Sequence, residues 1–298
     1  MSVRAQSVCF VPSFFSMRKE SMKMEMLGRW KEKNEWLTKK GFVLILSIAI
    51  IMVCQQNNPE EFMVVAHRGA SRAAPENTLA ALKKAIEYGA DYAECDVFQT
   101  KDGELVLFHD EEMERTTGKE GMIWEYTLAE LKNTEAGSWF KEEFKGEPIP
   151  TLREAMQLAR GKIKLDIEVK VSGRDPEIAE KVVDIIRSEN FEKACMVTSF
   201  EKWVIEKVKQ VAPELITGFI FDEEHPPGIF EGDWDYVCSN RNMVDDAFMQ
   251  KAKQNGKKVF VWTVNYPGEM ERLIELGVDG IITDVPEILR EVLFSIKG

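Results

Sequence analysis

The sequence predicts a (β/α)8 barrel between residues 62 and 298. Two observations carry this prediction: strand-like apolar segments alternate with helix-like ones, and eight strands remain when one hairpin strand is set aside. A third observation agrees, because polar residues directly follow several strands, where such barrels carry their chemistry. The expected strands are 63–66, 92–98, 163–169, 195–200, 216–221, 236–239, 259–264 and 280–283.

Helix-like stretches lie between most of the predicted strands. Their apolar residues recur at three- and four-residue spacing, which is typical of a helix that buries one face. The link 222–235 is short and rich in proline and glycine, so we expect its helix to be missing or reduced. The expected helices are 78–88, 151–160, 176–188, 201–211, 245–254 and 267–276.

A hairpin follows the second strand. Only a few residues, which include Asp102-Gly103, join that strand to the apolar segment 105–108. A parallel crossover needs about a dozen residues or more, so an antiparallel pair with the Asp-Gly turn at its tip is expected. This geometry returns His109 towards the second strand.

Residues 111–150 interrupt the alternation of strands and helices. The segment begins at the hairpin, next to His109 and near the expected site. We therefore expect it to form a small cap on the barrel. The chain thus divides into a leader, 1–61, and a barrel, 62–298, which contains the insertion.

The leader is basic and contains one uninterrupted apolar run, 42–53, flanked by Lys39-Lys40. This run is short for a membrane span, which needs about 20 residues, and suits the core of a signal peptide better. A buried core helix is the alternative, but no amphipathic pattern surrounds the run. The basic flank favours a cytoplasmic N-terminus, so we expect export or membrane anchoring, with the barrel outside the cytoplasm.

Two details bear on how the leader is processed. The basic stretch ahead of the apolar run is too long for an ordinary signal head, and a start at Met26 would leave a short lysine-rich one. The segment 51–54 resembles a bacterial lipoprotein cleavage box, although Val53 stands where a small residue is usual. A lipid on Cys54 is therefore a second route to the membrane.

The net charge of −12 argues against nucleic acid as a partner. Residues 1–40 carry nine Lys or Arg and four Asp or Glu, a balance of +5, which leaves −17 for the remainder. An acidic body without a basic patch does not supply the phosphate neutralisation that nucleic-acid binding requires. The five cysteines show neither metal-site spacing nor a disulfide pattern.

Acidic side chains follow one face of two predicted barrel strands. Glu94 and Asp96 are two residues apart and therefore share a face. Asp166, Glu168 and Lys170 alternate in the same way, with Asp166 expected to lie deeper and to be structural. The carboxylates of Glu94, Asp96 and Glu168 repel one another unless a cation lies among them, and oxygen ligands suit Mg²⁺ or Ca²⁺ better than zinc. One divalent cation is predicted here; for Lys170 the alternative to a functional role is an ion pair with a neighbour.

Two of the three histidines are expected beside these carboxylates. His67 follows the first strand and His109 follows the hairpin. A lone histidine at a strand end is more often structural, but two beside a carboxylate cluster favour acid–base chemistry near neutral pH. Either histidine can be the acid or the base. The third, His225, lies in an acidic, proline-rich loop and is given no role.

This pattern closely resembles the glycerophosphodiester phosphodiesterase family over about residues 62–298. The motifs that carry the resemblance are H-R-G at 67–69, P-E-N-T at 75–78, E-x-D at 94–96, T-x-D-G at 100–103 and H-D at 109–110. Further agreement comes from R-T-T-G at 115–118, I-P-T-L-R-E at 149–154 and W-T-V-N at 262–265.

The resemblance implies roles for the carboxylates and the two histidines, and the charge of two further residues indicates theirs. It implies Glu94, Asp96 and Glu168 as ligands of the divalent ion. It implies His67 and His109 as the acid–base pair. The cations Arg68 and Lys170 then bind phosphoryl oxygens, for which arginine offers two parallel hydrogen bonds.

Three further residues have two interpretations each. Glu76 and Asn77 follow a proline and are typical of a helix start, but the resemblance places them beside the metal, so they are secondary candidates. Trp262 either walls a substrate pocket or packs in the core.

The implied reaction is hydrolysis of a glycerophosphodiester, such as glycerophosphocholine, to glycerol 3-phosphate and an alcohol. The nearest alternative is a lysophospholipase D-like or phospholipase C-like activity, which a membrane anchor would favour. A catalytically inactive barrel that acts as a binding module is a further alternative, although a binding module has no need for both histidines and all three carboxylates.

Overall fold

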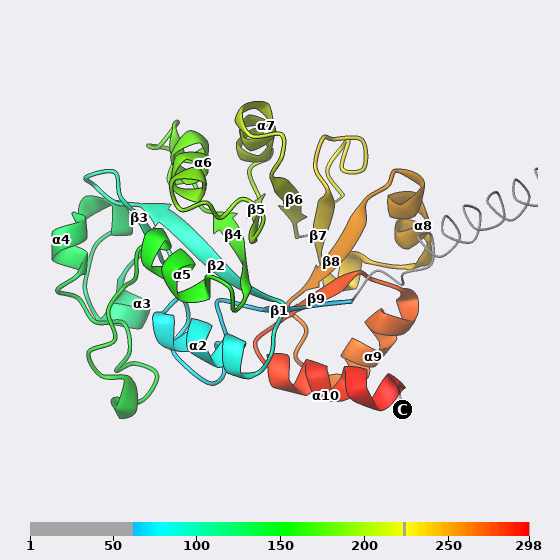
Figure 1. The fold of residues 1–298 in the computed structure, drawn as a ribbon, viewed down its shortest axis with the longest axis horizontal. Coiled ribbons are helices and arrows are strands. Elements are labelled where there is room, and N and C mark those ends of the chain that lie inside the picture. Colours follow the sequence, from blue (N-terminus) through cyan, green and yellow to red (C-terminus); the bar gives the residue numbers. More distant parts are fainter. Residues whose placement is uncertain (1–61, 223–224, 298) are drawn as a thin grey trace, which may run out of the picture. The chain divides into compact units, whose positions relative to one another are not determined.

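The strands of the chain close into a ring. The computed structural model describes residues 62–222 and 225–297, and Figure 1 shows helices around the strands of this part. Its eight parallel strands pair in the order β1-β9-β8-β7-β6-β5-β4-β2, and β1 also pairs with β2. The predicted (β/α)8 barrel is thus confirmed. The strands are β1 Met63–Ala66, β2 Tyr92–Gln99, β4 Lys164–Val169, β5 Cys195–Ser199, β6 Ile216–Phe221, β7 Tyr236–Asn240, β8 Lys258–Trp262 and β9 Gly280–Thr283.

Side chains fill the barrel interior, so the barrel is a packed core. The rings of Tyr236 and Phe260 lie 4.6 Å apart within this inner cluster. A larger apolar layer lies between the strands and the helices. The inner cluster comprises Val65, Tyr92, Met196, Ile220, Tyr236, Cys238, Phe260 and Ile282. Because this cluster fills the interior of the barrel, a polar site has room only at the carboxyl ends of the strands.

The predicted hairpin is present. Strand β3, Leu105–Leu107, pairs antiparallel with β2. The turn is closed by the Thr100 N–H, which donates to the Glu104 carbonyl, and Gly103 adopts a φ of +88° that favours glycine. The Phe108 N–H then donates to the Asp96 carbonyl at 3.0 Å. The hairpin therefore delivers the next residue, His109, beside β2.

The predicted helices are found, with ends that shift by one or two residues. Between β6 and β7 the described residues form turns without a helix, as the two prolines and glycine at 226–228 predict. A last helix, α10 Pro286–Lys297, was not among the expected ones; Leu289, Val292 and Leu293 are buried along it. The other barrel helices are α2 Leu79–Glu87, α5 Leu152–Ala159, α6 Ile178–Ser188, α7 Lys202–Val211, α8 Asp246–Gln254 and α9 Pro267–Leu276.

The start of α2 corrects one expectation. Thr78 is the N-cap, and its Oγ1 accepts a hydrogen bond from the Ala81 N–H at 3.2 Å. Glu76 and Asn77 lie in the turn before the cap, where Asn77 has a φ of +55°. Their interpretation as residues that open the helix is wrong, because the chain has not yet reached helical geometry there. Their side chains are free for other contacts.

The insertion has short helices and an apolar cluster of its own. It contains α3 Glu114–Thr117, η1 Ile123–Glu125, α4 Leu128–Leu131 and η2 Glu142–Phe144. This cluster joins the insertion to the hairpin, and the two lie on the same side of the barrel in Figure 1. Its buried members are Phe98, Val106, Phe108, Met113, Ile123, Leu131, Ala136 and Ile149. Arg115, on α3, is thereby held next to the carboxyl end of the hairpin.

No helix in the described part of the chain is long and apolar enough to span a membrane. The predicted apolar run 42–53 and Cys54 lie outside the described residues.

Candidate active site

A sharp turn after β1 brings the first site residues into place. Arg68 has a φ of +52° and Gly69 a φ of +78°. The Arg68 N–H donates to Glu94 Oε2 at 2.6 Å, and the Gly69 N–H donates to the Glu94 carbonyl at 3.0 Å. A Cβ on Gly69 would lie 2.6 Å from the Cβ of Ala81. Only glycine allows this turn to fit against α2, and the turn directs His67 and Arg68 into the barrel mouth.

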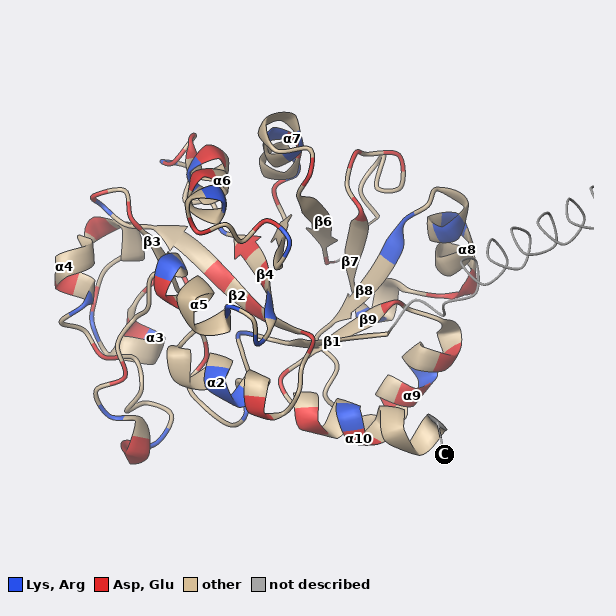
Figure 2. Ribbon diagram, viewed as in Figure 1, with Lys and Arg blue, Asp and Glu red and all other residues tan. Residues whose placement is uncertain are grey.

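The three predicted carboxylates meet at the mouth. The parallel register places Asp96 opposite Glu168 on β4, and one oxygen each of Glu94, Asp96 and Glu168 lie within 4.8 Å of one another. Figure 2 shows the acidic bands on β2 and β4. Glu94 is 3% exposed, and its Oε1 has no hydrogen-bond partner. Burial, followed by the charges of Asp96 and Glu168, raises the pKa of Glu94 well above its ordinary value.

Asp96 is the most strongly neutralised member of the cluster. Asn77 Nδ2 donates to its Oδ2 at 2.8 Å, and the Asp96 N–H donates to Asn77 Oδ1 at 3.0 Å. Lys170 Nζ lies 3.1 Å from Asp96 Oδ1 and also pairs with Glu168. Burial opposes ionisation, but the nearby cations, Lys170 first, hold the pKa of Asp96 at about 2. Asn77 thus belongs to the site, and Lys170 forms the ion pair that was its alternative interpretation.

Asp166 lies deeper, as expected. It is 1% exposed and accepts a hydrogen bond from Thr198 Oγ1 at 2.7 Å. Burial raises the pKa of Asp166 to about 7. Its hydrogen-bond partner lies on the neighbouring strand β5, which fits a structural role, and its side chain also lines the pocket at the barrel mouth.

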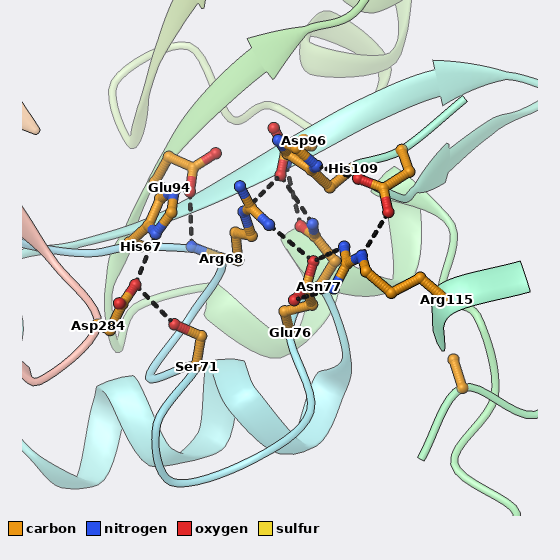
Figure 3. Close-up of polar contacts among 12 residues, drawn as sticks. His67, Arg68, Ser71, Glu76, Asn77, Glu94, Asp96, His109, Arg115 and Asp284 are labelled. Atoms are coloured by element: carbon orange, nitrogen blue, oxygen red, sulfur yellow. Dashed lines mark hydrogen bonds and ion pairs between the residues drawn. The ribbon is translucent and has the colours of Figure 1, made fainter. Parts of the chain in front are cut away.

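His67 is oriented by the carboxylate of Asp284, which directly follows the last strand, β9. Its Nδ1 lies 2.7 Å from Asp284 Oδ1, which also accepts from Ser71 Oγ at 3.0 Å (Figure 3). Asn265 Nδ2 donates to the other Asp284 oxygen at 2.6 Å. Burial opposes ionisation, but the His67 and Asn265 hydrogen bonds hold the pKa of Asp284 at about 2. A carboxylate at Nδ1 assigns the proton to that nitrogen and leaves Nε2 free to exchange a proton.

His109 is oriented in the same way from the other side of the pocket. Its Nδ1 lies 2.5 Å from Asp110 Oδ1. Burial lowers the pKa of the His109 imidazole, although the charge of Asp96 opposes this shift. Neutral imidazole is therefore favoured, with Nε2 again free.

The basic and aromatic candidates line the same pocket. Arg68 Nη1 donates to Glu76 Oε1 at 2.8 Å, and its Nε lies 3.5 Å from Asp96 Oδ2 (Figure 3). The ring of Trp262 lies 5.7 Å from that of Phe200 at 81°, an edge-to-face pair. Trp262 also packs against the inner cluster, so both of its interpretations hold in part. The pocket has a volume of about 110 Å³, and both histidines and all three clustered carboxylates line it.

The sequence-based prediction missed the partners of the two histidines. Asp110 was recognised only as part of the H-D motif. Its position directly after His109 could have indicated that its carboxylate contacts the His109 ring. Asp284 follows the last strand, which pairs with β1 only because the barrel closes. Arg115 bonds both Glu76 and Asp110, and Asn265 supports Asp284. The bonds of Arg115 to Glu76 and of Asn265 to Asp284 span 39 and 19 residues, so no local pattern shows them, whereas Arg115 and Asp110 are only five residues apart.

Fold and pocket together define a class of protein: a (β/α)8 barrel whose strand ends gather a carboxylate cluster, two carboxylate-bound imidazoles and two cations. The model of the glycerophosphoryl diester phosphodiesterase family matches residues 67–288. A glycerophosphodiester phosphodiesterase of Caldanaerobacter subterraneus subsp. tengcongensis is 42% identical over 239 residues, which cover 76% of this chain and 96% of that one.

Two solved structures agree with these sequence matches. A phosphodiesterase of Oleispira antarctica, in complex with the product sn-glycerol-3-phosphate, has a TM-score of 0.74 and 31% identity; the match covers 78% of this chain and 96% of that one. A glycerophosphodiester phosphodiesterase of Thermotoga maritima has a TM-score of 0.65 and 27% identity, over 78% of this chain and 98% of that one. The chain belongs to the glycerophosphoryl diester phosphodiesterase family and is a phosphoric diester hydrolase.

The raised pKa of Glu94 predicts how stability depends on pH in chelator-treated protein. Because the folded state binds this proton more tightly than the unfolded state, stability falls as pH rises above about 4.5 and through the folded pKa. Glu94→Gln keeps an oxygen that can accept from Arg68 but removes the charge. We expect the variant to melt at a higher temperature than the wild type near pH 8 and to show a smaller difference near pH 5.

Thermal unfolding in EDTA across this pH range checks the prediction. Glu206→Gln, at an exposed side chain paired with Lys202, is the control and should match the wild type. A Glu94→Gln variant that is less stable at every pH would contradict the account.

Proposed function

We propose that this chain hydrolyses glycerophosphodiesters to glycerol 3-phosphate and an alcohol, with His67 and His109 as acid and base and one divalent cation, Mg²⁺ or Ca²⁺, as cofactor. The observation that carries the proposal is that both imidazoles, each with Nδ1 on a carboxylate, line the pocket that holds the three-carboxylate cluster. Family membership supports the substrate class.

The residues present fit the proposed cation. Glu94, Asp96 and Glu168 offer oxygen ligands only, which suits Mg²⁺ or Ca²⁺. The buried Glu94 Oε1 without a partner supports the same assignment, since such an atom is costly unless a ligand satisfies it. When bound, the cation supplies positive charge that stabilises developing charge on the phosphoryl oxygens.

The protein's own residues divide the remaining work. Arg68, exposed to the pocket on one side and held by Glu76 on the other, is placed to hydrogen-bond a phosphoryl oxygen. Lys170 pairs with Asp96 and Glu168 and adds a second positive charge. Trp262 and Phe200 form an apolar wall beside them. The substrate phosphate would thus meet cations on one side and a surface that excludes water on the other.

The proton transfers follow from the two free Nε2 atoms. In the first step one histidine, neutral and unprotonated at Nε2, accepts the proton of the glycerol 2-hydroxyl, whose oxygen attacks phosphorus. The bond from phosphorus to the alcohol oxygen breaks, and the other histidine, which enters the step as imidazolium with a proton on Nε2, protonates that oxygen and becomes neutral. In the second step water opens the cyclic phosphate with the roles reversed, which gives glycerol 3-phosphate. An internal hydroxyl has a large entropic advantage over water as the first nucleophile.

We further propose that the catalytic barrel works outside the cytoplasm, exported or anchored through the run 42–53 or a lipid on Cys54. Fractionation of the full chain tests this proposal. The full chain should be found in the membrane or exported fraction, and a chain without 42–53 in the cytoplasmic fraction. Equal distribution of the two chains would sink the proposal.

Assays of substrates that differ in headgroup and acylation, each with and without divalent metal, test the reaction. We expect glycerol 3-phosphate to be released from glycerophosphocholine, abolished by EDTA and restored by Mg²⁺ or Ca²⁺. Lysophosphatidylcholine is the comparison substrate. Turnover of the acylated substrate alone would favour the lysophospholipase D-like or phospholipase C-like alternative, and undiminished activity in EDTA would remove the cation from the proposal.

Substitution of the histidines tests the acid–base pair. Because general acid–base catalysis contributes about 10²–10⁴-fold, His67→Ala and His109→Ala should each lower kcat by that factor with little change in folding. His225→Ala is the control, since that ring packs against Phe221 and Phe248 outside the pocket. A His109→Ala enzyme with wild-type kcat would show that the pair is not catalytic.

A further inference from the structure

Arg115 makes three donor contacts to two different carboxylates. Its Nε donates to Asp110 Oδ2 at 2.5 Å, while Nη1 and Nη2 donate to Glu76 Oε2 and Oε1 at 2.9 and 2.7 Å (Figure 3). The bond to Glu76 is thus bidentate. Such a fork fixes both the distance and the orientation of its partners, which a single ammonium cannot do.

Each of these carboxylates also holds a group of the pocket. Asp110 binds His109 through its other oxygen at 2.5 Å, and Glu76 Oε1 accepts from Arg68 Nη1 at 2.8 Å. Arg115 itself does not line the catalytic pocket. It therefore links, through one carboxylate each, the imidazole proposed for proton transfer and the guanidinium proposed for phosphate binding.

The electrostatics agree with this linkage. Burial opposes ionisation of Glu76, but the hydrogen bond from Arg115 is the largest effect that lowers its pKa. At Asp110 burial again opposes ionisation, and Arg115 leads the effects that lower its pKa. Both carboxylates are held charged, as they must be to accept from His109 and Arg68.

Other residues of the insertion hold the Arg115 side chain and its helix in place. The guanidinium carbon of Arg115 lies 5.8 Å from the centre of the Trp139 ring, which also belongs to the insertion. Helix α3 begins beside the fully buried Met113, whose carbonyl accepts from Thr117 Oγ1 at 2.7 Å. Gly118, with a φ of +69°, ends the helix. The packed apolar cluster of the segment 111–150 thus holds the Arg115 side chain next to the site.

We propose that Arg115 is a positioning residue for catalysis, by which the insertion fixes His109 and Arg68 relative to one another. The insertion is then a part of the active site and not only a cover. This inference rests on the proposed function, in which those two residues act on the substrate.

Arg115→Ala tests the inference in the full chain with metal supplied. We expect kcat for glycerophosphocholine to fall roughly 10–100-fold, by analogy with the loss seen when groups that orient metal ligands are removed. Arg187→Ala is the matched control, because Arg187 has the same exposed side-chain fraction, 44%, and pairs with Glu214 away from the pocket. The control should keep its activity.

Three readouts separate positioning from a structural role. Millimolar ethylguanidinium should restore part of the activity of Arg115→Ala, which a stability defect would not allow. Arg115→Lys, which keeps the charge but not the fork, should stay closer to the alanine variant than to the wild type. Glu76→Gln should lower kcat much less when it is added to Arg115→Ala than when it is made in the wild type, because the two groups act together.

The outcomes distinguish this inference from the proposed function. A wild-type chain that releases no glycerol 3-phosphate contradicts the proposed function. An active wild type with Arg115→Ala within about twofold of Arg187→Ala overturns only the role of Arg115. Should Arg115→Ala fail to fold, Arg115→Lys decides: full activity overturns the inference, and a folded but impaired enzyme supports it.

Discussion

Repulsion among the carboxylates at the barrel mouth is the constraint on which the rest of the site depends. The ladder between β2 and β4 sets Asp96 beside Glu168 and Glu94 beside Asp166. The ladder fixes the backbone positions of these side chains, and burial leaves them little access to water, so the fold gathers acidic groups in a buried place. Arg68, Lys170 and Asn77 relieve part of the repulsion. Glu94 Oε1 is left without a hydrogen-bond partner, and this is the atom that the proposed divalent cation would contact.

The two histidines also depend on carboxylates that the fold places beside them. Each has one ring nitrogen on a carboxylate, and those carboxylates come from opposite ends of the barrel sequence: Asp110 follows the hairpin and Asp284 follows β9. Closure of the ring between β1 and β9 is what brings Asp284 to His67. Barrel closure therefore supplies His67 with its carboxylate, whereas His109 takes its carboxylate from the next residue in the chain.

Most of the fold could be predicted from the sequence, because alternating strands and helices leave local patterns. The i, i+2 spacing of Glu94 and Asp96 likewise predicted a shared face. Prediction failed where backbone geometry or distance along the chain decides. Asn77 lies in the turn before α2 with a positive φ, and the bond from His67 to Asp284 spans 217 residues. Arg115 was visible only as part of a motif, since its partner Glu76 lies 39 residues away.

The central claim is that Glu94, Asp96 and Glu168 bind one divalent cation between them. Anomalous diffraction from crystals of this chain grown with Mn²⁺ tests it most directly, because manganese accepts oxygen ligands and scatters anomalously. We expect a peak in contact with all three carboxylates, and we expect that peak to be lost in Glu94→Gln crystals. A peak at another acidic group, such as Asp110 and its neighbours, with none among these three, would contradict it.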